Sequence, residues 1–230
     1  MRHNNIDGVI FDLDDTLFDC TGQLSGAARQ RAADVICSQK PDLDIQTLIQ
    51  CQETLSETLG SSGALKEIGR QYGLSDTLLN QARSAYNLNI VENITPFPET
   101  VATLDRLAQR GYKLALVTSG HPDRQRLKVE QLQLTAYFHE KNGTLVLHDD
   151  QKSTDKGPFI QQAADQLNLP CEVILAVGDK LDAEISAANA LGMMTVRIRH
   201  GRQKNRLPKA PEEYPDMDIN TLDQLLSILP

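Results

Sequence analysis

Acidic side chains follow two short apolar runs in this 230-residue chain. Asp12 and Asp14 come directly after the apolar letters VIF, and the letters VILAVG are followed by Asp179 and then Glu184. Because an unpartnered buried carboxylate is costly, these acids need a cation beside them. Clustered carboxylate oxygens are the ligands that Mg²⁺ prefers. The pattern therefore predicts a magnesium site built from Asp12, Asp14, Asp179 and Glu184.

A third apolar run ends in Thr118, Ser119 and Gly120, and a lysine precedes a helical pattern further along the chain. We prefer Lys156 for this role because it stands immediately before the helical pattern, with Lys152 as the alternative. A phosphoryl group needs its charge neutralised by a metal, a lysine, and hydroxyl or backbone donors. Thr118, Ser119, Gly120 and Lys156 are therefore candidate phosphate-binding residues.

The same acids offer a route to covalent chemistry. An aspartate can act as a nucleophile and form an aspartyl-phosphate intermediate. A second acid two residues further on could donate a proton and later accept one. Asp12 and Asp14 have this spacing.

Helices and buried strands must alternate to position these residues. Helix-face spacing of apolar residues precedes most of the apolar runs, and such alternation is typical of an α/β fold with a doubly wound parallel sheet. Ligands bind such sheets at the carboxyl ends of the strands, where the candidate residues stand. The expected strands are residues 9–11, 114–117, 173–177 and 195–198, with 145–147 as a weaker candidate.

One long segment breaks this alternation. Residues 19–95 contain no convincing strand and show helical stretches near 24–39, 45–59, 63–72 and 75–90. We therefore expect a core domain of residues 1–18 and 96–230, with a helical domain of residues 19–95 inserted after the first strand. The letters GSSG at 60–63 predict a flexible turn in that insert.

Composition excludes several classes of protein. The formal net charge of −8 argues against a general nucleic-acid binder. The basic run at residues 197–209 is then expected to be a solvated loop, whose Arg199 or Arg202 could also attract an anionic substrate. The longest apolar run is too short to cross a bilayer. Four unpatterned cysteines and a polar N-terminus favour a cytoplasmic protein with no nucleic-acid or membrane partner.

Four motifs in this order resemble those of the haloacid dehalogenase-like (HAD) hydrolase superfamily. They are DLDDT (12–16), LVTSG (116–120), Lys156 and VGDKLDAE (177–184). The resemblance, to the phosphatase-like branch of subfamily I, covers residues 6–18 and 96–229. It implies a Rossmann-like core, and by position it makes the helical insert a small cap domain.

The resemblance also implies a role for each matching residue. Asp12 is similar to the nucleophile that attacks phosphorus, and Asp14 to the general acid and base whose backbone carbonyl also ligates Mg²⁺. Thr118 is similar to the hydroxyl that binds a phosphoryl oxygen, Lys156 to the lysine that shields the charge, and Asp179 to the third metal ligand. A Mg²⁺-dependent phosphatase acting on a small phosphorylated metabolite is the function implied.

Two residues depart from the family pattern. Glu184 stands where the family usually has aspartate, and it could reach the metal directly or through a water. Lys180 stands where a small polar residue is common. These departures keep open a non-catalytic binding protein with a degenerate site, while a phosphomutase or another phosphoryl transferase would use the same acids. The sequence leaves the natural substrate and the oligomeric state open. If the insert is a cap, residues 19–25 and 60–63 are the expected substrate contacts.

Overall fold

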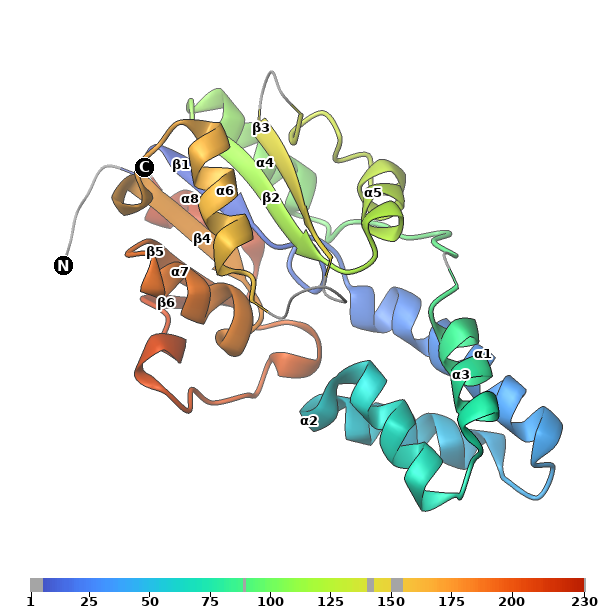
Figure 1. Cartoon of the computed structure of the whole chain (residues 1–230). Helices are drawn as coiled ribbons and strands as arrows, with labels where there is room; N and C mark the ends of the chain where they lie inside the picture. Colours follow the sequence, from blue (N-terminus) through green and yellow to red (C-terminus); the bar gives the residue numbers. More distant parts are fainter. Residues whose placement is uncertain (1–5, 89, 140–142, 150–154, 230) are drawn as a thin grey trace. The chain divides into compact units, whose positions relative to one another are not determined.

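A six-stranded parallel sheet has the strand order β3-β2-β1-β4-β5-β6 (Figure 1). The computed structural model describes residues 6–88, 90–139, 143–149 and 155–229. Because every strand pair is parallel, all the carboxyl ends meet at one edge of the sheet. The strands are β1 Gly8–Phe11, β2 Lys113–Ser119, β3 Gly143–His148, β4 Ile174–Gly178, β5 Met194–Ile198 and β6 Met217–Ile219.

Five of these strands confirm the sequence prediction, and the sixth was missed. β6 has only three residues, and one of them is the exposed Asp218. It is an edge strand that pairs with β5 alone, so it has neither the length nor the continuous apolar character of a buried strand.

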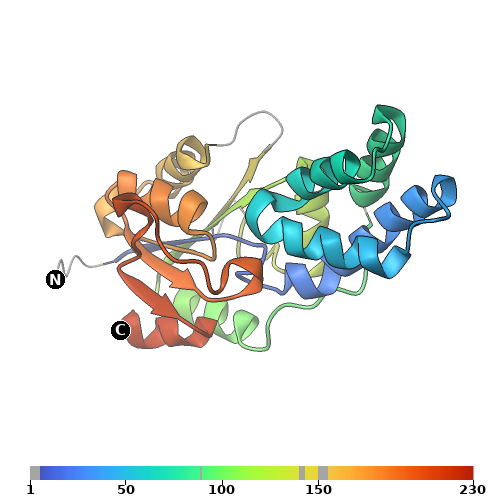
Figure 2. The ribbon, with the colours of Figure 1, turned by 90° about the horizontal axis from the view of Figure 1, so that it is seen from below.

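Helices cover both faces of the sheet, as the predicted doubly wound fold requires. α6 and α7 lie on one face and α4 and α8 on the other (Figures 1 and 2). α6 illustrates why such a segment forms a helix on the sheet. One of its faces buries Ile160, Ala163, Ala164 and Leu167, and Asn168, in the left-handed conformation, caps its C-terminus. The helices around the sheet are α4 Thr100–Gln109, α5 Pro122–Gln131, α6 Gly157–Leu167, α7 Ser186–Ala190 and α8 Leu225–Ile228.

The core beneath α6 and α7 is aliphatic. Ile10 of β1, Val117 of β2 and Ala176 of β4 pack there against Ile160 and Ala188. All five side chains are buried. Burying a Val, Leu or Ile side chain contributes about 1.5–3 kcal/mol, so this packing holds the strand ends in place.

The chain divides into two compact units. The core unit is Met1–Cys20 together with Val91–Pro230, and the helical unit is Thr21–Ile90. In the helical unit, α1 Gly26–Gln39, α2 Ile45–Gln71 and α3 Asp76–Tyr86 bury a cluster of apolar side chains. The described residues of this unit include no strand, as the sequence predicted.

The predicted break at 60–63 is present at Gly60. α2 consists of two helical stretches joined by a kink at this residue, whose φ of 68° and ψ of 171° are not helical. Ala64, Leu65 and Ile68 are buried just beyond Gly60. Their packing stabilises the helical stretch that begins after the kink, while Gly60 takes the positive φ that glycine tolerates.

The expectation of a solvated basic loop is wrong for its first residue. Arg197 lies in β5, is 1 % exposed, and donates a hydrogen bond of 2.9 Å to the carbonyl of Arg206. Arg199 pairs with Asp218 at 2.9 Å. Within the described part of the chain, no helix combines the length and apolar character needed to cross a membrane.

Candidate active site

Two aspartates meet at the carboxyl edge of the sheet. Asp12 follows β1 and Asp179 follows β4, and these strands are direct neighbours. The backbone N–H of Asp12 donates to the carbonyl of Val177 at 2.9 Å, which extends the ladder to the first residue of the site. Both side chains are buried, with 3 % of Asp12 and 1 % of Asp179 exposed.

Lys156 brings a cation to this pair of strand ends. It is the N-cap residue of α6, and its Nζ lies 2.6 Å from Asp12 Oδ1 and 2.6 Å from Glu184 Oε1. All three side chains are at least 95 % buried. Burial alone would lower the pKa of Lys156, but the two carboxylates raise it, so the ammonium stays charged. The rival Lys152 lies outside the described residues.

Glu184 has both carboxylate oxygens engaged. Oε1 accepts from Lys156, and Oε2 accepts a hydrogen bond of 3.2 Å from the backbone N–H of Lys180. Gly178 leaves room for this approach, because a Cβ there would lie 2.8 Å from the Glu184 side chain. Burial would raise the pKa of Glu184, but Lys156 and Lys180 outweigh it and lower it.

Asp12 and Asp179 are less well compensated. Burial raises the pKa of Asp12 to about 6, against the opposing effect of Lys156. Burial also raises the pKa of Asp179 well above its ordinary value. Asp12 Oδ2 and Asp179 Oδ1 are buried and have no hydrogen-bond partner among the described residues. Two such oxygens are what a divalent cation would satisfy.

The residues at this edge fit Mg²⁺. Within the described ranges, no three carboxylate, imidazole or thiol groups converge as a closed metal site. Mg²⁺ usually takes only one or two protein carboxylates and keeps several waters, so a closed site is not required. Asp12 and Asp179 supply two carboxylate oxygens of this kind.

Asp14 is held by a lysine that the sequence analysis missed. Lys128 Nζ lies 2.8 Å from Asp14 Oδ1 and 2.7 Å from Oδ2. Gln125 donates a further hydrogen bond of 3.3 Å to Oδ2. Burial would raise the pKa of Asp14, but Lys128 outweighs it and lowers it. The sequence does contain one sign of this contact, because Gln125 and Lys128 have the spacing of residues on one helix face. Since α5 is polar along most of its length, this face does not differ from the exposed ones in the sequence.

Thr118 is joined to this cluster and Ser119 is not. Thr118 is fully buried at the end of β2, and its Oγ1 accepts a hydrogen bond from Gln125. Ser119 Oγ lies 2.9 Å from Nδ1 of the buried His148. The backbone N–H of Gly120 donates to the carbonyl of His148 at 2.9 Å. The backbone N–H of Gly120 is therefore already used within the sheet edge and could donate to a phosphate only if it left His148.

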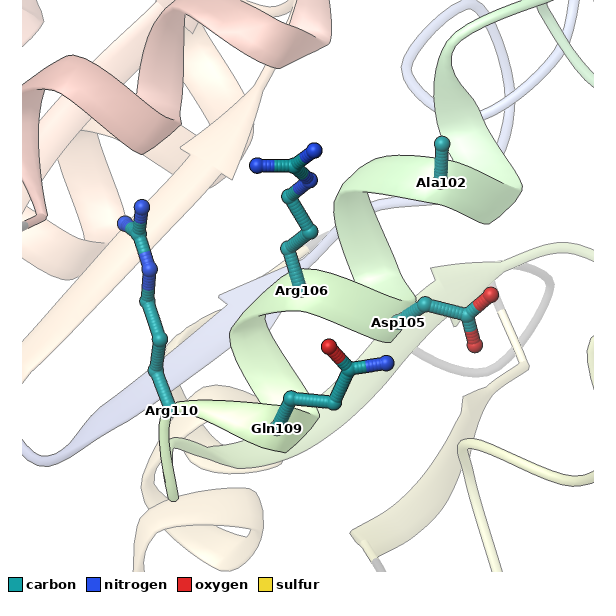
Figure 3. A pocket seen from close by; sticks show the side chains of 5 residues that line it. All are labelled: Ala102, Asp105, Arg106, Gln109 and Arg110. Carbon is teal, nitrogen blue, oxygen red and sulfur yellow. The ribbon is translucent and has the colours of Figure 1, made fainter.

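A hollow of about 440 Å³ lies along α4 and its C-cap residue Arg110 (Figure 3). Its lining residues are Ala102, Asp105, Arg106, Gln109 and Arg110. Most of them stand in the second half of α4, which leads into the amino end of β2. The hollow thus belongs to the opposite edge of the sheet from the acids, and no residue of the cluster lines it.

Comparisons with known proteins concern the family and the fold of the chain. The sequence model of the family described as haloacid dehalogenase-like hydrolase matches residues 9–198. A glyceraldehyde 3-phosphate phosphatase of Methanopyrus kandleri is 31% identical over 97% of each chain. One of the same name from Methanocaldococcus jannaschii is 27% identical over 97% of each. A solved structure of a predicted phosphoglycolate phosphatase from Haemophilus somnus has a TM-score of 0.75 at 19% identity, covering 99% of this chain and all of that one.

Proposed function

The chain belongs to the haloacid dehalogenase-like hydrolase family, and on that premise we propose a Mg²⁺-dependent phosphatase that works through an aspartyl-phosphate on Asp12. The observation that carries the proposal is the state of the Asp12 carboxylate. Lys156 holds Oδ1 at 2.6 Å, while Oδ2 is buried without a hydrogen-bond partner in the described structure. One oxygen is thus anchored, and the other lacks the partner that phosphorus or a metal would supply.

The first half of the reaction transfers the phosphoryl group to the protein. A carboxylate oxygen of Asp12 forms a bond to phosphorus as the bond to the leaving oxygen breaks. Asp14, ionised beside Lys128 in the free protein, takes up a proton from solvent as the substrate binds and passes it to that leaving oxygen. The Thr118 hydroxyl and the Lys156 ammonium offset charge on the phosphoryl oxygens.

The second half returns Asp12 to its starting state. A water oxygen bonds to phosphorus, its proton passes to Asp14, and the bond between Asp12 and phosphorus breaks to release inorganic phosphate. Asp14 as found beside Lys128 is in the ionised form that accepts this proton. Mg²⁺, held by Asp12, Asp179 and the Asp14 carbonyl with Glu184 nearby, would neutralise phosphoryl charge throughout.

We infer a small phosphorylated metabolite as the substrate, with glyceraldehyde 3-phosphate as the first candidate. Its support is the name of the relatives that match the chain over nearly their whole length. If the helical unit acts as a cap, it supplies the contacts to the carbon part of that substrate. The phosphoryl chemistry rests on the core unit alone.

The test is phosphate release with and without Mg²⁺ from glyceraldehyde 3-phosphate and from 4-nitrophenyl phosphate. We expect metal-dependent turnover in the wild type and a loss of about 10³-fold or more in Asp12→Asn, because a nucleophile is removed. Asp223→Asn is the matched control, since Asp223 is exposed, lies in the short helix Leu222–Gln224, and is not one of the candidate site residues. Absence of turnover across phosphate monoesters, or an active Asp12→Asn variant, would refute the proposal.

A second measurement addresses the intermediate. The wild type quenched in acid during turnover should carry one phosphoryl group on the peptide that contains Asp12, detectable by mass spectrometry. Phosphate transfer to a second substrate hydroxyl without net phosphate release would instead indicate a phosphoryl transferase.

A further inference from the structure

α5 directs two polar side chains at one carboxylate. Gln125 and Lys128 are three residues apart, so they lie on the same face of the helix. Only 4 % of the Lys128 side chain is exposed, and its Nζ contacts both oxygens of Asp14. Gln125 donates to Asp14 and also to Thr118, so it links the two residues.

The surroundings of Lys128 are otherwise weakly polar. Its Nζ lies 5.9 Å from the centre of the Phe18 ring and 3.8 Å from Cys20 Sγ. Taking an ammonium out of water is costly, and a buried ion pair at best roughly offsets that cost. Stability is therefore a poor reason to keep a lysine at this position, whereas contact with a reacting carboxylate is a good one.

We propose that Lys128 is a positioning residue, which with Gln125 fixes the Asp14 carboxylate relative to the phosphate-binding hydroxyl of Thr118. The inference rests on the proposed function, because it assigns Asp14 the proton transfers of that mechanism. Because Lys128 contacts both carboxylate oxygens, the Asp14 side chain is held in one orientation from which to reach the leaving oxygen. Without Lys128, the Asp14 side chain would adopt several orientations.

A comparison of two leaving groups distinguishes a positioning role of Lys128 from a merely structural one. When the bond between phosphorus and an alkyl oxygen breaks, that oxygen is a strong base and needs the proton from Asp14. The 4-nitrophenolate oxygen leaves without protonation. Because kcat/KM reports the steps through transfer to Asp12, a misplaced Asp14 lowers kcat/KM for glyceraldehyde 3-phosphate far more than for 4-nitrophenyl phosphate.

The experiment compares this ratio of kcat/KM values in Lys128→Met, Lys128→Arg and Gln125→Met at saturating Mg²⁺. We expect the alkyl-to-aryl ratio to fall by about 10- to 100-fold in Lys128→Met, since small displacements of a catalytic group cost that much. Lys128→Arg should recover part of the loss, because it retains the charge. Gln125→Met keeps the ion pair and should lower the ratio by a smaller factor.

The control is Arg126→Met, which removes an exposed cation from the same helix and should keep the wild-type ratio. The ratio does not depend on the folded fraction, since both substrates are measured on one preparation. A wild-type or increased ratio in Lys128→Met overturns the inference while the phosphatase assignment stands. A wild type that hydrolyses neither substrate overturns both.

Discussion

Removing the charge of Asp12 should change how the stability of the metal-free protein depends on pH. Burial raises the pKa of Asp12 from 3.8 to about 6 in the folded protein. A carboxyl group whose pKa is raised on folding stabilises the folded state while it is protonated. That contribution is present at low pH and is lost as the pH rises through about 6.

The magnitude follows from the two pKa values. A shift from 3.8 to about 6 is worth about 3 kcal/mol in total. Between pH 5 and pH 7.5 the linkage relation gives a loss of about 1.4 kcal/mol, or about 3 to 6 °C in Tm. The groups with lowered pKa values, Asp14 and Glu184, act at more acid pH and fall outside this window.

The assay is thermal unfolding in EDTA at pH 5 and pH 7.5, for the wild type and for Asp12→Asn. The wild type should lose about 3 to 6 °C more than the variant, since asparagine does not titrate. Lys156 keeps Glu184 as a partner in the variant, so no buried cation is left alone. Equal pH dependence of Tm in the two proteins would refute the reasoning.

Mg²⁺ binding provides an independent measure of the raised pKa of Asp12. A proton on Asp12 competes with the metal, so the apparent Kd for Mg²⁺ measured by calorimetry should be about tenfold weaker at pH 5 than at pH 7.5. Asp179, whose pKa is also raised, changes the affinity in the same direction. An unchanged Kd would show that neither carboxylate titrates in this range.

Two further predictions concern positions around the site. Gly201→Ala should destabilise the protein by about 2 kcal/mol or more in denaturant unfolding, because φ is 59° and the new Cβ would lie 2.7 Å from Asp15 Cβ. The control is Gly26→Ala, which has open space around it and should be neutral or slightly stabilising. Equal effects of the two substitutions would contradict this prediction. Lys156→Met should lower the free energy of unfolding at pH 7.5 by about 3–5 kcal/mol, since two buried carboxylates lose their shared cation. The control is Lys66→Met, which replaces an exposed lysine. A Lys156→Met protein as stable as the wild type would disprove the pairing.

The sheet could be predicted from sequence because its signals are local. Continuous apolar runs bounded by polar residues identify buried parallel strands, and five of six were found this way. β6 escaped because it is short and half exposed. The break between the two stretches of α2 was also found, because glycine is a local signal for the positive φ that Gly60 adopts.

Some residues of the candidate site could likewise be predicted from sequence and others could not. Asp12 and Asp179 could be expected together because parallel strands bring their carboxyl ends to one edge. The partners of Asp14 and Ser119 could not. Lys128 is 114 residues from Asp14, and His148 is 29 residues from Ser119. A lysine in a polar helix carries no local sign that it will be buried.

The sequence by itself determined which acids, hydroxyl and lysine stand at strand ends, because apolar periodicity and chain polarity are encoded residue by residue. Only the tertiary structure decided how the charges pair: Lys156 with Asp12 and Glu184, and Lys128 with Asp14. The reason is physical. A buried charge is stabilised by whichever opposite charge shares its low-dielectric surroundings, and that neighbour is chosen by packing in space rather than by distance along the chain.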